Sequence, residues 1–269
     1  MILSRGGRAV SLMYHDVVTN GDVASSGFDG PGADIYKLDR GEFAQHLAGI
    51  ALAPSTVDAS GTVRGGSPTG LPVFLTFDDG GVTAHSNAAP LLEERGWRGL
   101  FYITTDRIGT TGFVSASQLR DLLARGHVIG SHSCSHPKRI SDCSRTELQH
   151  EWGDSVDALE QILGSPVTTA SVPGGFYSRL VGSSAAAAGV KILFTSEPTT
   201  RVGEVDGCLL LGRYGVWRGM PVSTSADIAR GRVLPRLRQS AYWSIKKAAK
   251  SLPGDPYGKL RGLLLDRRS

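Results

Sequence analysis

Short apolar segments alternate with longer amphipathic ones along most of the chain. The run at 72–77 is almost continuously apolar and rich in strand-forming residues, which is typical of a buried strand. Similar runs predict strands at 8–14, 99–104, 126–130 and 169–172. Apolar residues between these runs recur at helical spacing, and they predict helices at 39–50, 84–95, 115–125 and 144–163. This alternation indicates an α/β fold of one domain.

Metal-binding residue types follow two of the predicted strands. Asp78 and Asp79 lie in the segment TFDDG at 76–80, and His132 and His136 lie in HSCSH. Two adjacent carboxylates at a strand tip repel each other unless a cation or a proton separates them. A metal that binds one carboxylate and both imidazoles, and leaves the other carboxylate as a base, satisfies all four residues. The alternative is a simple turn beside polar loop histidines, but both motifs in this order favour the metal site.

These two motifs together resemble those of the polysaccharide deacetylases of the NodB-homology type, carbohydrate esterase family 4. The resemblance covers residues 8 to about 220, and it implies a distorted (β/α) barrel with catalytic residues at the carboxyl ends of its strands. By motif position, it implies that Asp78 is the general base. It also implies that Asp79, His132 and His136 hold one divalent ion, zinc or another first-row metal such as cobalt or nickel.

A third motif is kept only in part. The segment PGGFYS at 173–178 resembles the family loop that walls one side of the substrate groove, which implies substrate contacts by Pro173 and Tyr177. The family usually has an Arg just before this Pro, paired with the catalytic Asp, but Ser171 and Val172 stand there in this chain. Arg213 is the nearest candidate for the missing charge and joins the predicted substrate-binding set. An ordinary surface Arg is the alternative.

The predicted general acid comes from an early motif. The usual family pattern has a late His in this role, but no His follows His150. The segment LMYHDV at 12–17 instead resembles an early signature of the branch that deacetylates poly-N-acetylglucosamine, in which the motif order is circularly shifted. This resemblance implies that His15 is the acid, with a buried structural His as the alternative.

The resemblance therefore implies a metal-dependent hydrolase that removes N-acetyl groups from a sugar in a polysaccharide or lipid-linked saccharide. Two other functions stay open at this point. One is hydrolysis of another non-peptide C–N bond or of an acetyl ester by the same fold. The other is a non-catalytic saccharide-binding relative, for which the missing Arg is the main argument.

Charge divides the chain unevenly. Residues 230–269 contain eleven Lys/Arg and two Asp/Glu, a net charge of +9, whereas the rest of the chain carries −5. We therefore predict a catalytic domain at 8–220 and a basic, partly helical extension at 221–269. Apolar residues mixed with Lys and Arg in this extension are typical of peripheral contact with an anionic membrane. A solvated helical tail packed on the barrel is the alternative, and no recognised module predicts nucleic-acid binding.

Cysteine content and apolar run lengths bear on the compartment. Three cysteines, Cys134, Cys143 and Cys208, exclude a complete disulfide framework, and Cys134 is not expected to be a metal ligand. The first residues lack the apolar stretch of a signal peptide, and no segment has 18 uninterrupted apolar residues. We expect a cytoplasmic protein that acts in solution or at the inner face of the membrane.

Overall fold

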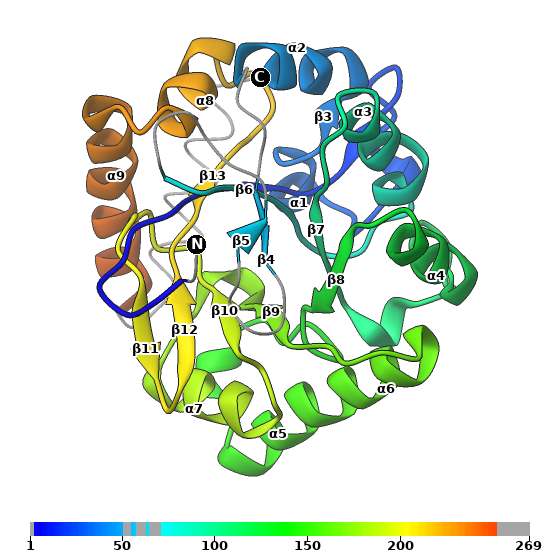
Figure 1. The fold of residues 1–269 in the computed structure, drawn as a ribbon, viewed down its shortest axis with the longest axis vertical. Helices are drawn as coiled ribbons and strands as arrows, with labels where there is room; N and C mark the ends of the chain where they lie inside the picture. Colours follow the sequence, from blue (N-terminus) through cyan, green and yellow to red (C-terminus); the bar gives the residue numbers. More distant parts are fainter. Residues whose placement is uncertain (1–2, 51–54, 58–62, 65–70, 252–269) are drawn as a thin grey trace.

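A curled nine-stranded sheet forms the centre of the molecule (Figure 1). The computed structural model describes residues 3–50, 55–57, 63–64 and 71–251. The strands of the sheet are β1 (Val10–Tyr14), β6 (Val73–Phe77), β7 (Leu100–Ile103), β8 (Val128–Ser131), β9 (Thr169–Ser171), β10 (Ile192–Phe194), β11 (Gly203–Val205), β12 (Cys208–Leu211) and β13 (Tyr214–Gly215). Their order is β11-β12-β10-β9-β8-β7-β6-β1-β13, and every neighbouring pair is parallel except β11 and β12. This arrangement confirms the predicted α/β class and the distorted barrel.

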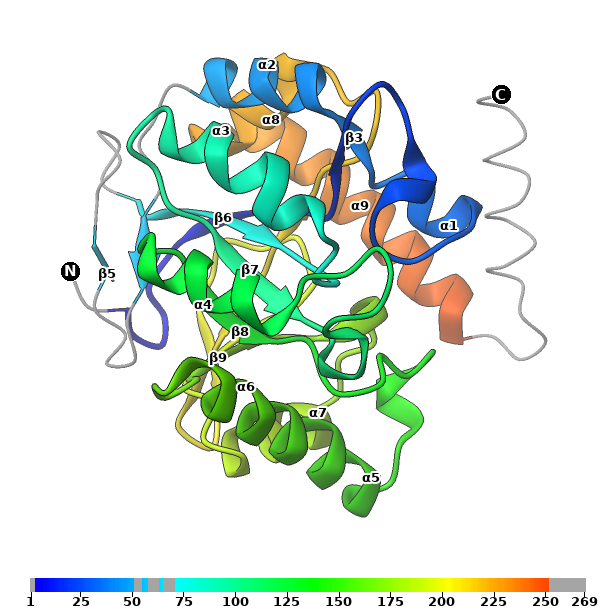
Figure 2. The ribbon, with the colours of Figure 1, turned by 90° about the vertical axis from the view of Figure 1, so that its right-hand side faces the viewer.

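Helices surround the sheet (Figures 1 and 2). They are α1 (Pro31–Asp34), α2 (Arg40–Ile50), α3 (Ala89–Glu93), α4 (Ala116–Ala124), α5 (Arg145–Gln149), α6 (Ser155–Leu163), α7 (Arg179–Ala187), α8 (Val222–Ala229) and α9 (Val233–Ser251). Two small two-stranded sheets pair β2 (Val17–Val18) with β3 (Leu38–Asp39), and β4 (Thr56–Val57) with β5 (Val63–Arg64). None of the described helices combines the length and apolar character needed to span a bilayer.

Local sequence signals explain where several helices begin. Ser115 and Ser144 each form a capping box with the residue three positions later, so α4 and α5 begin where the sequence predicts. The predicted helix at 144–163 is real but contains a π-helical turn at 150–154 between α5 and α6. A π-helical turn also opens the predicted helix at 84–95, because α3 begins only at Ala89. Such turns reorient a helix without ending it.

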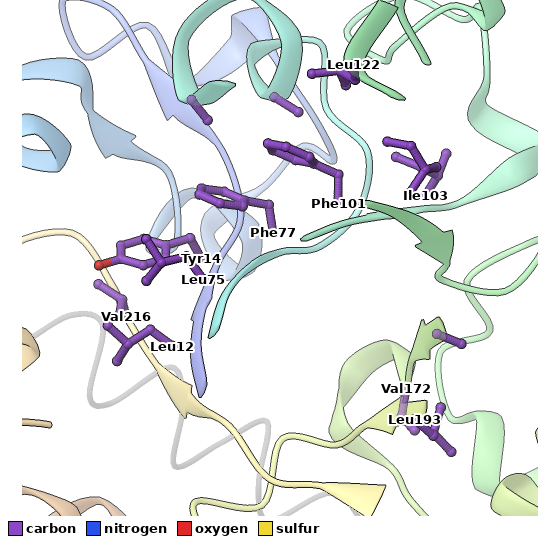
Figure 3. Close-up of a cluster of buried hydrophobic side chains, with 14 of the residues drawn as sticks. Leu12, Tyr14, Leu75, Phe77, Phe101, Ile103, Leu122, Val172, Leu193 and Val216 are labelled. Carbon is purple, nitrogen blue, oxygen red and sulfur yellow. The ribbon is translucent and has the colours of Figure 1, made fainter. Parts of the chain in front are cut away.

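An aromatic cluster packs between the sheet and the helices on one side (Figure 3). Tyr14 and Phe77 stack with ring centroids 5.5 Å apart, and Phe77 stacks on Phe101 at 4.8 Å. Phe43 of α2 packs edge-on against both Tyr14 and Phe77. All four side chains are buried, and this apolar packing fixes the positions of the ends of β1, β6 and β7.

The register of β1 and β6 determines which residues meet at the carboxyl edge of the sheet. The two strands are parallel, and Tyr14 pairs with Phe77 at their last positions. The next residues, His15 and Asp78, therefore leave the sheet side by side. The Asp78 amide also donates to the Tyr14 carbonyl at 3.1 Å, which continues the pairing by one residue.

The described part of the C-terminal segment packs on the rest of the molecule. Helix α8 packs against α2 and β1. On α9, Gln239 donates to the Gly215 carbonyl at 3.1 Å, and Ser240 donates to the Pro198 carbonyl at 2.7 Å. Much of the segment for which membrane contact is predicted, residues 252–269, lies outside the described residues.

Candidate metal centre and surrounding cavity

A cavity of about 520 Å³ opens at the carboxyl edge of the sheet. His15, Asp78, Asp79, His132 and His136 all line it, and they follow three different strands. The carboxyl ends of parallel strands in a barrel-like sheet meet at one edge, which is where such folds place their functional residues. The structure thus brings together five residues that are spread over more than a hundred positions of the sequence.

Both carboxylates of the TFDDG segment face this cavity. In a regular strand, successive side chains point to opposite faces. Asp79 instead has a left-handed backbone, with φ of 74°, and Gly80 follows with φ of 84°. The chain turns sharply after β6, so Asp78 and Asp79 both line the same space. A left-handed Asp is an uncommon conformation that is often found where function requires it.

The histidine loop is held by a similar set of turns. Ser133 and His136 both have positive φ, 67° and 58°. The Ser133 amide donates to Ser131 Oγ at 3.1 Å, and the His136 amide donates to Ser133 Oγ at 3.2 Å. These local bonds fold the five-residue loop back on itself, and the rings of His132 and His136 lie with their centroids 5.1 Å apart.

Asp79, His132 and His136 form a cluster of metal-ligand atoms. The Oδ1 atom of Asp79 lies 3.3 Å from Nε2 of His132 and 3.6 Å from Nε2 of His136. One ligand atom from each of the three residues lies within 4.8 Å of the others. His132 Nδ1 donates to the Ser171 carbonyl at 3.0 Å, so its Nε2 is the atom left to bind a metal. One carboxylate and two imidazoles suit a divalent first-row ion such as zinc.

The electrostatics of the cluster suit a cation. Burial raises the pKa of Asp79, but the hydrogen bond with His132 and the charges of His15 and His136 outweigh this effect and hold it well below its ordinary value. Burial lowers the pKa of His132, yet Asp78 and Asp79 outweigh it, and the net direction is upward. For His136, burial and the charge of His132 lower the pKa. Two buried carboxylates therefore draw positive charge to this point, and a metal ion would supply it.

Arg213 lies behind Asp78 and is fully buried. Its Nη1 donates to Asp78 Oδ1 at 2.6 Å, and its Nη2 donates to Asp78 Oδ2 at 2.8 Å. Burial raises the pKa of Asp78, but the charges of Arg213 and His132 outweigh this effect and lower it. The alternative reading of Arg213 as a surface residue is wrong. Arg213 is also not among the residues that line the cavity, so within the described chain it contacts the Asp rather than the open space.

Ser171 connects Asp78 with His132. Its Oγ donates to Asp78 Oδ1 at 3.0 Å and lies 2.6 Å from His132 Nδ1. In the sequence, Ser171 stands out only as one of the two residues in place of the missing Arg. Its position as the last residue of β9, at the same edge as the other site residues, is the signal that could have revealed it.

His15 faces the cavity, whereas its neighbour Asp16 faces the protein interior. The His15 ring stacks on Tyr36 with centroids 4.7 Å apart, and its buried Nδ1 has no hydrogen-bond partner among the described residues. Asp16 accepts hydrogen bonds from Ser26 and Thr83, and burial raises its pKa. Asp16 therefore anchors the loop at 20–35, which contributes Phe28 and other residues to the cavity wall.

The PGGFYS loop borders the cavity through different side chains from those expected. Gly174, Gly175 and Phe176 line the cavity, but Pro173 and Tyr177 are not among its lining residues. Pro173 is buried, and the Tyr177 ring lies against Gly182 of α7. Burial raises the pKa of the Tyr177 hydroxyl. The positive φ of both glycines, 62° and 70°, turns Phe176 rather than Tyr177 to the open side.

Comparison with known proteins gives one family. The family model described as "Polysaccharide deacetylase" matches residues 65–193. A Bacillus subtilis (strain 168) protein named "Putative polysaccharide deacetylase YxkH" is 24% identical over 215 residues, which are 78% of this chain and 71% of that protein.

Solved structures share the fold. The Streptococcus pyogenes deacetylase PplD, in complex with acetate, matches with a TM-score of 0.65 at 20% identity, over 81% of this chain and 96% of that one. IcaB from Ammonifex degensii also matches with a TM-score of 0.65 at 20% identity, over 84% of this chain and 98% of that one.

Proposed function

The chain belongs to the polysaccharide deacetylase family, and from this premise we propose that it is a metal-dependent hydrolase that removes N-acetyl groups from a polysaccharide or lipid-linked saccharide. The observation that carries the proposal is the cluster of Asp79, His132 and His136 ligand atoms beside Asp78 in one cavity. In this proposal, these three residues hold one divalent ion, most suitably zinc.

When bound, such an ion polarises the acetyl carbonyl and makes a water molecule more acidic. In the proposed reaction, Asp78 accepts a proton from the attacking water. Arg213 keeps Asp78 ionised and fixes the direction of its carboxylate, because it binds both oxygens from behind. Ser171 adds a third fixed contact to the same group. A base held this way needs little rearrangement during the reaction.

His15 is proposed to donate a proton to the departing sugar amine. Support comes from its position, because it lines the same cavity as His132 and His136 and leaves the sheet next to Asp78. Stacking on Tyr36 fixes the plane of its ring. General acids of this kind contribute about 10²–10⁴-fold to a rate.

Acetate release from N-acetylated oligosaccharides by the zinc-loaded protein tests the proposal directly. Asp78→Asn should keep the metal and lose turnover, while Asp121→Asn, on the surface of α4, should retain both. Release of acetate only from aryl esters or non-sugar amides would favour the other C–N or ester hydrolysis instead. Saccharide binding without any hydrolysis would favour the non-catalytic relative.

The surface of α9 favours a second function, peripheral binding to an anionic membrane. The large hydrophobic residues that are exposed in the described chain all lie on this helix: Val233, Leu234, Leu237, Tyr242 and Ile245. Arg232, Arg236 and Arg238 lie among them in the sequence, and such a mixture suits a lipid interface. Co-flotation with anionic vesicles at low salt should weaken in Leu237→Ser and as salt rises. A full-length protein that ignores these vesicles at low salt would overturn this function.

A further inference from the structure

One wall of the cavity comes from the C-terminal helix. Trp243 of α9 lines the cavity together with Phe28, Tyr36 and Phe176. The indole lies against the PGGFYS loop, because a Cβ atom placed on Gly175 would be 2.9 Å from Trp243 Cη2. Figure 2 shows α1, which carries Ala33 of the lining, on the same side of the molecule as α9. A residue far outside the predicted catalytic region therefore borders the candidate active site.

The helix is positioned by contacts that do not involve the indole. Besides the bonds from Gln239 and Ser240, Arg236 donates to Thr200 Oγ1 at 3.4 Å. These three contacts lie within the two turns before Trp243. Docking of α9 thus presents the indole to the cavity from a fixed support, which is what a binding residue requires.

The indole is not needed for the hydrophobic core. Trp152 is fully buried, and Trp97 and Trp217 pack against the main core cluster. Within the described residues, Trp243 belongs to neither core cluster and is only partly buried. The indole therefore lines the cavity from outside both core clusters.

A sugar ring can bind against an aromatic cavity wall. A pyranose has an apolar face of C–H groups and a polar rim of hydroxyls, so it can stack on an indole while its rim stays hydrated. We infer that Trp243 is a specificity-determining residue that stacks on a sugar ring of the substrate, and that α9 is therefore part of the active site. This inference rests on the proposed function and extends it to the C-terminal helix.

Kinetics of acetate release from N-acetylglucosamine oligomers test the inference in the zinc-loaded full-length protein. Trp243→Ala should raise KM by about threefold to tenfold, the range expected for one aromatic contact, with kcat little changed. Trp243→Phe should retain much of the affinity. The matched control is Ser244→Ala, because Ser244 is the next residue on α9, is exposed and does not line the cavity. It should leave KM unchanged.

Two further measurements separate stacking from a structural role. Inhibition by acetate, which has no ring to stack, should be the same in wild type and Trp243→Ala, and so should the bound zinc content. Oligosaccharide should change the tryptophan fluorescence of wild type and Ser244→Ala, but not that of Trp243→Phe.

The outcomes distinguish this inference from the proposed function. An unchanged KM in Trp243→Ala would overturn the stacking role alone, as would a loss of kcat or of zinc without a change in KM. Absence of acetate release by the wild type, together with saccharide binding that depends on Trp243, would overturn the proposed hydrolysis and leave the stacking role supported.

Discussion

Arg213 binds both carboxylate oxygens of Asp78 across 135 positions of sequence, at 2.6 and 2.8 Å. The two side chains are almost completely buried, with exposed fractions of 0% and 3%. Arg213 also donates to Thr76 Oγ1 and to the Thr195 carbonyl, so its charge is paired and four of its five N–H groups have acceptors. The family Arg that is missing before Pro173 therefore has a counterpart from a different strand end. A positive charge thus lies beside Asp78, although no Arg occupies the position that the resemblance predicts.

Removal of Arg213 should destabilise the protein strongly. Arg213→Met leaves Asp78 buried without its partner, which should lower the free energy of unfolding by about 3–5 kcal/mol in chemical denaturation. The double variant with Asp78→Asn should recover part of this loss, because no unpaired charge then remains. Arg218→Met is the control, since the Arg218 side chain bonds only the Lys37 carbonyl in the described structure and its loss should cost less. Equal losses for Arg213→Met and Arg218→Met would contradict this account of the pair.

The metal should bind through the Asp-His-His cluster. Purified protein should hold about one divalent ion per chain, and His132→Ala or His136→Ala should lose both the ion and acetate release, because each removes one of three ligands. Elemental analysis and activity after chelation measure this. His85→Ala, whose ring pairs with Asp121 away from the cavity, should behave as wild type. Full activity after thorough chelation would exclude a metal-dependent mechanism.

His15 should matter for turnover and not for metal binding. His15→Ala should retain zinc but reduce kcat by about 10²–10⁴-fold, as expected for loss of a proton-transfer group. Parallel zinc and kinetic measurements check both statements. Tyr36→Leu removes the ring that stacks on His15 and should produce a smaller loss. A His15 variant that loses zinc would instead identify His15 as a ligand, and one that unfolds would identify it as a structural residue.

Stability should fall on acidification partly through His127, which lies away from the cavity. Its Nδ1 accepts from the Gly99 amide at 3.0 Å, and its Nε2 lies 2.7 Å from Glu93. Burial is the main cause that lowers the pKa of His127 below its usual 6.5, despite the opposing effect of Glu93. The unfolded chain therefore takes up the proton more readily, so this contribution is complete above about pH 6.5 and is lost as the pH falls.

Chemical denaturation between pH 7 and pH 5 checks the role of His127. The free energy of unfolding should depend less steeply on pH in His127→Gln than in wild type. NMR titration of the wild type should show a neutral His127 ring at about pH 6.5, where a free imidazole is half protonated. Identical pH dependence in the two proteins would mean that His127 does not contribute.

The sequence by itself determined the fold class and the neighbourhood of the site. Local patterns were enough to predict the strands that precede Asp78, Asp79, His132 and His136. One general property of parallel sheets, that the carboxyl ends of their strands share an edge, then predicted that these residues meet. The position of His15 beside Asp78 follows from the same property, because β1 and β6 are paired in parallel. Capping boxes at Ser115 and Ser144 were equally local, and the helices begin there.

Only the tertiary structure decided which distant side chains complete the site. Ser171, Arg213 and Trp243 reach it from β9, the β12–β13 connection and α9. The sequence offered only Arg213 as a candidate, and only the packing of the chain placed its charge beside Asp78. Phe176, and not Tyr177, lines the cavity because Gly174 and Gly175 adopt left-handed backbone conformations. These dihedral angles cannot be read from the sequence. Periodicity reports what one element buries on its own face. Contacts between elements depend on how the whole chain packs, and those long-range contacts set the charge beside Asp78 and the aromatic wall of the cavity.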